Sequence, residues 1–149
     1  MTDTTSAIKA GMTGSAELIV GEEHTAPRVG SGKIRVLATP VMINLIEAAA
    51  LKAAEHLLPP GHQSLGTLLN VKHIAATPVG MKIKATATVT KVEGRNIFFD
   101  VSAEDEKEII GGGTHELPGE KHQPGCGFGE AGFPVFMSSD ILHDLFGVF

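Results

Sequence analysis

The stretch TPVMINLIEAAALKAAEHLL, residues 39–58, is the one long helix that the sequence predicts. Alanine and leucine dominate this stretch, and both are strong helix formers. Thr39 is a suitable N-cap, Pro40 fits the first helical position, and the Pro-Pro-Gly at 59–61 ends the helix. The first three turns are apolar nearly all round, so we expect this helix to be buried on most sides.

Segments with strand character lie on both sides of this helix in the chain. Residues 81–92, MKIKATATVTKV, alternate between apolar and polar side chains, as a half-buried strand does. The other candidate strands are residues 15–20, 65–77, 96–103 and 108–116. One strand, a helix and four further strands joined by short turns predict an α+β fold. In this fold an antiparallel sheet of about five strands wraps around one long central helix.

The length of 149 residues suits a single domain. We expect a flexible N-terminal tail at 1–14 and the folded domain at 15–116. Residues 117–149 are rich in glycine and proline and show no clear period. They predict a C-terminal appendage, to which the sequence assigns no role.

Composition excludes several classes of function. The net charge of −5 argues against a nucleic-acid-binding protein, which would normally carry a basic face. The single cysteine, Cys126, allows no internal disulfide. The first residues lack the apolar run of a signal peptide, and no stretch approaches the roughly 18 apolar residues of a membrane span. We therefore expect a cytoplasmic protein that binds neither nucleic acid nor membrane.

Two segments narrow the fold further: LATPVMINLIEAAAL at 37–51 and SLGTLLNVKHIAATPVGMKIKATATVTKVEGRNIFFDVSAEDEKEIIGGGTHE at 64–116. Their most specific parts are the threonine before the helix, the glutamate inside it, the Ser-Leu-Gly-Thr segment and the strand histidine before Ala-Ala-Thr-Pro. As a set, they resemble the fluoroacetyl-CoA thioesterase family over roughly residues 15–116. The resemblance implies the hotdog fold and the hydrolysis of a small acyl-CoA to free acid and CoA.

The resemblance also implies roles for individual residues. The family's catalytic threonine, glutamate and histidine fall on Thr39, Glu47 and His73. The glycine that helps to hold the thioester oxygen falls on Gly66. The resemblance further implies a homodimer with active sites at the subunit interface, and a higher oligomer is the alternative. Neither a cofactor nor a metal is expected.

The residues themselves support part of this assignment. Glu47 is flanked by apolar residues, so poor solvation should raise its pKa and strengthen the carboxylate as a base. It could attack the thioester, activate water, or simply be a carboxylate at the rim of the helix. A lone strand histidine such as His73 is more often a packing residue, but its pKa near neutrality suits proton transfer.

The spacing of Thr39 and Glu47 sets a constraint. On one continuous helix their Cα atoms are separated by about 12 Å along the axis, so direct contact is not expected. Either substrate or water lies between them, or residues of a partner subunit take part. Gly66 is either a strand-end breaker or the source of a backbone N–H that can approach an oxygen closely.

Two departures from the family pattern limit what the resemblance implies. Leu117 stands where the family often has arginine. Residues 28–38, RVGSGKIRVLA, hold no aromatic residue where the specialised fluoroacetyl-CoA enzyme has phenylalanines, so fluoroacetate specificity is not expected. His115, His122 and Cys126 have no standard zinc-ligand spacing, so no metal site is predicted from them.

Two other functions fit the same fold. One is a non-catalytic hotdog protein that binds an acyl-CoA as a sensor or carrier. The other is a hotdog hydratase or dehydratase, which would usually need an Asp-His pair, and no such pairing is evident. Fold alone does not separate these functions from hydrolysis.

Overall fold

The computed structural model describes residues 7–58, 62–64 and 66–121 of the chain. Its strands are β1 (Thr13–Ile19), β2 (His62–Ser64), β3 (Leu68–His73), β4 (Lys82–Glu93), β5 (Asn96–Glu104) and β6 (Ile109–Lys121). Its helices are α1 (Ala26–Val29) and α2 (Thr39–Ala54), and its short 3-10 turns are η1 (Glu22–His24) and η2 (Glu55–Leu57). Within the described ranges, no helix is long and apolar enough to cross a membrane.

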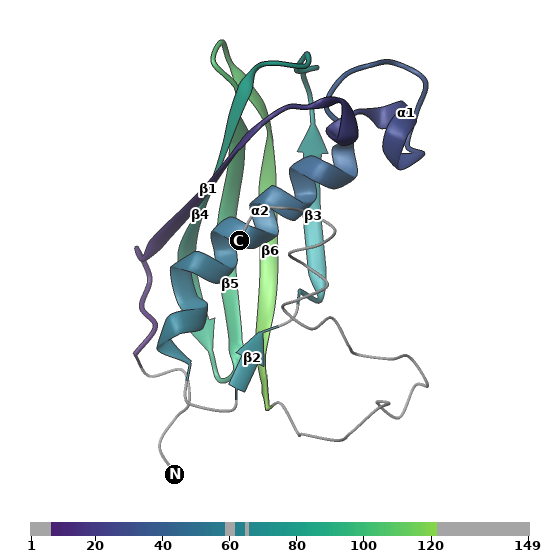
Figure 1. Ribbon diagram of the computed structural model, residues 1–149. Helices are drawn as coiled ribbons and strands as arrows, with labels where there is room; N and C mark the ends of the chain where they lie inside the picture. The colour runs from purple at the N-terminus through teal and green to yellow at the C-terminus, as the bar shows by residue number, and fades with distance from the viewer. Residues whose placement is uncertain (1–6, 59–61, 65, 122–149) are drawn as a thin grey trace, which may run out of the picture.

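The sheet is antiparallel throughout. Its main strands follow the order β1-β4-β5-β6-β3, and the short β2 pairs with the end of β6. The helix α2 lies across one face of this sheet (Figure 1), where it contacts β1, β4 and β5. This arrangement confirms the predicted α+β hotdog fold with one long helix.

The core lies between α2 and the inner face of the sheet. Side chains of β4 and β5 alternate between buried and exposed over most of their length, as the sequence predicts for β4. The buried members are Ile83, Ala85, Ala87 and Val89 of β4 and Ile97, Phe99, Val101 and Ala103 of β5. Many of these side chains are small, so the helix can lie close to the sheet.

The helix α2 approaches β1 so closely that backbone meets backbone. A Cβ atom added at Gly14 of β1 would lie 2.3 Å from the carbonyl oxygen of Ala49 and 2.4 Å from the amide nitrogen of Ala53. Only glycine on the strand leaves room for this contact. The small alanine side chains on the helix allow the two backbones to approach each other closely. The contact sets where α2 lies over the sheet.

Several element boundaries differ from those that the sequence predicts. The helix α2 has Thr39 as its first helical residue and Ala38 as its N-cap, so the prediction of Thr39 as the cap is wrong. Its α-helical part ends at Ala54 and continues as the turn η2. The strand expected at 65–77 is shorter and separate from β2, whereas β6 continues to Lys121 because its end pairs with β2.

The division of the chain into 1–14, 15–116 and 117–149 stays a prediction. β1 begins just inside the expected N-terminal tail, and β6 passes the expected end of the domain by a few residues. Residues 1–6 and 122–149 lie outside the described part of the chain.

We expect the Gly14→Ala variant to be less stable than the wild-type protein, because the new Cβ atom has no room against the α2 backbone. Overpacking of this kind typically costs about 1–3 kcal/mol. Urea unfolding measures the difference. Gly32→Ala is the control, because a Cβ atom there would meet only the Ala26 Cβ at 3.5 Å. Equal unfolding free energies for the two variants would contradict the close contact.

Candidate active site

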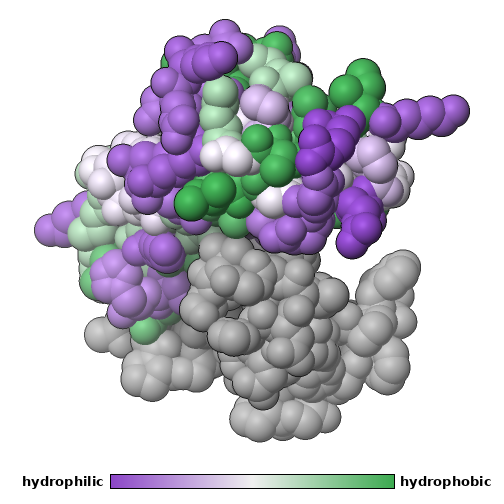
Figure 2. All heavy atoms as spheres, turned by 45° about the horizontal axis from the view of Figure 1, so that its top comes forward, coloured by the Kyte–Doolittle hydropathy of each residue, from purple (hydrophilic) through white to green (hydrophobic). Residues whose placement is uncertain are grey.

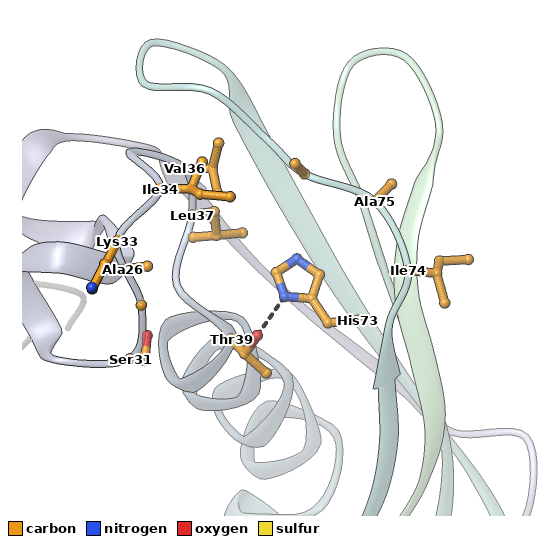
Figure 3. A pocket seen from close by; sticks show the side chains of 12 residues that line it. Ala26, Ser31, Lys33, Ile34, Val36, Leu37, Thr39, His73, Ile74 and Ala75 are labelled. Carbon is orange, nitrogen blue, oxygen red and sulfur yellow. Dashed lines mark hydrogen bonds between the residues drawn. The ribbon is translucent and has the colours of Figure 1, made fainter.

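The first turn of α2 and the last residue of β3 meet at one end of the sheet. The Thr39 Oγ1 atom lies 2.7 Å from the His73 Nδ1 atom, and Figure 3 shows this hydrogen bond. The N-cap of α2 is Ala38, one residue earlier, and the Thr39 hydroxyl bonds to the histidine. Thr39 is exposed and His73 is half-buried, so the pair lies at the molecular surface.

The environment of His73 favours the neutral ring. Burial lowers the pKa of His73 below its ordinary value, and a backbone contact with Ala75 offsets part of this effect. A neutral imidazole has one nitrogen that accepts a hydrogen bond, so Nδ1 can accept from the Thr39 hydroxyl. The pair can therefore take up and release a proton at a pH below the ordinary histidine pKa.

A cavity of about 400 Å³ opens beside this pair. Figure 3 shows it between the start of α2, the segment that follows β3 and the loop that precedes α2. The aliphatic side chains of Ile34, Val36 and Leu37 line it, together with Ser31 and Lys33. Among the described residues that line the cavity, none is a phenylalanine, tyrosine or tryptophan. Such a wall suits a small aliphatic group.

Backbone hydrogen bonds hold the loop that forms this wall. The Leu37 amide donates to the Thr77 carbonyl at 2.8 Å, and the Ala38 amide donates to the His24 carbonyl at 2.8 Å. The Thr77 hydroxyl donates in turn to an Asp105 carboxylate oxygen at 3.0 Å. The chain that leads into α2 is therefore held in place at both Leu37 and Ala38.

Glu47 lies about two turns further along α2 and faces a second group of residues. A Cβ atom added at Gly66 would lie 3.7 Å from Glu47 Oε2 and 2.8 Å from His115 Cε1. Within the described residues, no hydrogen bond joins Glu47 to Thr39 or His73. The structure thus brings Thr39 together with His73 and Glu47 together with Gly66. It keeps the two pairs apart, as the spacing along the helix predicts.

The half-buried carboxyl group of Glu47 is poorly solvated. Burial raises the pKa of Glu47 above its ordinary value, and the nearby His115 lowers it to a smaller extent. A carboxylate with a raised pKa is a stronger base than one in water. This agrees with the chemistry expected from the apolar sequence around it.

His115 is a residue of this site that the sequence analysis considered only as a metal ligand. It is fully buried on β6, and its Nδ1 atom lies 2.9 Å from the Leu68 carbonyl oxygen. Its ring stacks on Phe99, with centroids 6.2 Å apart. The alternation of the last strand was the available signal, because it places His115 on the same buried face as Leu117.

The other two residues considered as zinc ligands, His122 and Cys126, lie outside the described residues. Within the described ranges, no three His, Cys, Asp or Glu side chains come together in a way that could hold a metal ion.

Comparisons with protein families and with curated proteins both point to fluoroacetyl-CoA thioesterases. The family described as fluoroacetyl-CoA-specific thioesterase matches residues 20–117. A curated fluoroacetyl-CoA thioesterase from Streptantibioticus cattleyicolor is 47% identical over 81 residues, which are 54% of this chain and 58% of that relative. The match therefore spans less than two thirds of the curated relative.

Solved structures of the fluoroacetyl-CoA thioesterase FlK are also similar. One is 34% identical with a TM-score of 0.73, and the match covers 76% of this chain and 89% of that chain. A phenylalanine-to-alanine variant, in complex with fluoroacetate and CoA, is 34% identical with a TM-score of 0.71, and the match covers 76% of this chain and 96% of that one.

The fold and the family match together define a hotdog protein of the thioesterase class. The chain belongs to the fluoroacetyl-CoA-specific thioesterase family, which confirms the resemblance found in the sequence.

Proposed function

We propose that this protein is an acyl-CoA thioesterase that hydrolyses a small acyl-CoA to free acid and CoA. The observation that carries the proposal is the hydrogen bond of 2.7 Å between Thr39 and His73 beside an aliphatic cavity. The Glu47 carboxylate on the same helix supplies the base that hydrolysis needs. Family membership and a related thioesterase solved with CoA support the same activity.

The residues divide the reaction between them. Glu47 serves either as the nucleophile that attacks the thioester carbon or as the base that takes a proton from the attacking water. The Gly66 backbone N–H stabilises the negative charge that develops on the thioester oxygen. His73, held by Thr39, supplies the proton to the departing thiolate. If Glu47 activates water, the acyl carbon gains the water oxygen and the sulfur leaves as the thiol of CoA. If Glu47 attacks, the thiol leaves as an anhydride forms between the acyl group and Glu47, and water then hydrolyses this anhydride to the free acid and restores the carboxylate.

The wall of the cavity sets the preferred acyl group. Its side chains Ile34, Val36 and Leu37 are aliphatic, so a short unsubstituted acyl chain fits by contact alone. The loop at 28–38 has no aromatic residue. We therefore propose that fluoroacetyl-CoA is not preferred over acetyl-CoA, although the curated relative is named for the fluorinated substrate.

Free-thiol release from a panel of short acyl-CoAs tests the activity. We expect turnover by the wild-type protein. The Glu47→Gln variant should lose at least about 10²-fold in kcat, because glutamine keeps the size of the side chain and removes its basic group. Binding of an acyl-CoA without thiol release would favour a carrier or sensor, and near-normal kcat in the variant would exclude Glu47 as the reacting group.

The stability of the Glu47→Gln variant shows whether a loss of activity comes from misfolding. Because burial raises the pKa of Glu47 in the folded state, ionisation of Glu47 destabilises the fold as the pH rises through that pKa. Glu47→Gln removes this penalty. It should be at least as stable as the wild-type protein near neutral pH and should lose this advantage in acid, where Glu47 is protonated in both states. Thermal unfolding at the two pH values measures the difference.

We expect His73→Ala to lower kcat by about 10²–10⁴, towards the lower end because the CoA thiolate leaves readily. KM should change less, because proton transfer belongs to the transition state. His73 must be protonated to supply this proton, and burial lowers its pKa, so wild-type kcat should fall as the pH rises through a value below the ordinary histidine pKa. This loss of kcat with rising pH should be absent from the variant. Identical pH profiles for the two proteins, per folded molecule, would remove His73 from the mechanism.

We infer that the chain forms a homodimer through the edge of the sheet at β3. Within the described residues, this strand pairs with β6 and with no other strand, and its residues Leu68 and Leu69 are exposed. Ile34 and Ile74 are also exposed near the end of β3, the end that Figure 2 brings forward and where hydrophobic side chains gather. A second copy would cover this apolar edge and the exposed Thr39.

Sedimentation equilibrium at micromolar concentration tests this assembly. We expect a dimer for the wild-type protein and a weakened dimer for Leu68→Glu, because a buried unpaired charge opposes association. Ile19→Glu is the matched control, since Ile19 is equally apolar and 66% exposed but lies on β1 at the opposite edge. A wild-type monomer would overturn the proposal. The cytoplasmic location stays a prediction from the sequence.

A further inference from the structure

His115 is a fully buried ionisable side chain to which the proposed mechanism gives no task. Two contacts hold its ring in place: Nδ1 donates to the Leu68 carbonyl, and one face of the ring stacks on Phe99. Its other nitrogen, Nε2, is buried and has no hydrogen-bond partner within the described residues. A buried polar atom without a partner costs free energy, so it calls for an explanation.

The position of the unpaired nitrogen is specific. A Cβ atom at Gly66 would lie 3.4 Å from His115 Nε2 and 3.7 Å from Glu47 Oε2. The nitrogen and the carboxylate therefore border the same space, which the missing side chain of Gly66 leaves open. The Leu68 carbonyl can only accept, so Nδ1 carries a proton, and Nε2 is the ring nitrogen that borders this space.

We propose that His115 is a positioning residue that holds Glu47 in its ionised, reactive orientation across the gap at Gly66. The proposal rests on the proposed thioesterase function and adds a residue to the site. With Nδ1 bonded to the Leu68 carbonyl, Nε2 is the ring nitrogen that faces the carboxylate. An N–H at this position donates towards Glu47 and favours its ionised form although the side chain is half-buried.

The electrostatics of the site agree with this role. Burial raises the pKa of Glu47, and His115 lowers it. The other residues shown in contact with the His115 ring are Leu68 of β3 and Phe99 of β5, and neither ionises. Glu47 of α2 is the ionisable group whose carboxylate borders the same space as Nε2.

Two substitutions separate the two ring nitrogens. His115→Asn places an amide N–H near the position of Nδ1, where it keeps the bond to Leu68, and removes Nε2. His115→Gln places an amide near the position of Nε2 and gives up the bond to Leu68. We expect about a 10²-fold loss of kcat in the asparagine variant, as for the removal of one preorganised donor, with a smaller change in KM.

The glutamine variant should regain part of this loss, because its amide can donate to Glu47. In the asparagine variant the acid limb of kcat/KM should move to higher pH, because Glu47 loses the N–H that favours its ionised form. If the role of His115 is purely structural, both variants should lose stability. Each folded molecule should then turn over at the wild-type rate and with the wild-type pH profile. That result would overturn the proposal.

If neither His115 variant folds, the proposal can be tested in proteins that keep His115. The ¹⁵N resonances of the His115 ring are compared between the wild-type protein and Glu47→Gln. We expect the Nε2 resonance to move and the Nδ1 resonance to stay, and an unchanged Nε2 resonance would overturn the proposal. If the wild-type protein releases no thiol but Nε2 still responds to Glu47, the thioesterase function fails and the pairing stands.

Discussion

The arrangement of this protein depends on how closely α2 lies against the sheet. The contact of Gly14 with the backbone at Ala49 and Ala53 leaves no room for a shift of the helix towards β1. Because α2 is one rigid element, this contact also fixes Thr39 at its start and Glu47 two turns later. The two groups then face different parts of the sheet. Thr39 meets His73 of β3, whereas Glu47 lies near Gly66, two residues before β3, and near His115 of β6.

The two halves of the site differ in their relation to solvent. Thr39 and His73 lie at the surface beside the cavity, where a substrate and a second subunit can reach them. Glu47 and His115 lie deeper, so that the carboxylate is a stronger base at the expense of its own solvation. A thioester that spans the two halves would place its reacting carbon between a base on one side and a proton donor on the other.

Much of the fold, and the separation of the site into two parts, could be predicted from the sequence. The alanine-rich helix and the alternation of β4 reflect local periodicity, and both predicted the fold. The separation of Thr39 from Glu47 followed from helix geometry alone. The N-cap was misplaced because its assignment depended on where the Thr39 hydroxyl bonds, which β3 decides from far along the chain. The position of His115 beside Glu47 could not be predicted, because it depends on Glu47 and Gly66 meeting across the fold.

The central claim is that the two pairs on α2 act on one thioester. The most direct test is kcat, above the uncatalysed rate, for Glu47→Gln, His73→Ala and the double variant. Groups that act as a unit have strongly non-additive effects, so the account predicts a double variant about as slow as the slower single variant. A double variant whose loss equals the product of the two single losses would contradict the account, because it would mean that the pairs work independently.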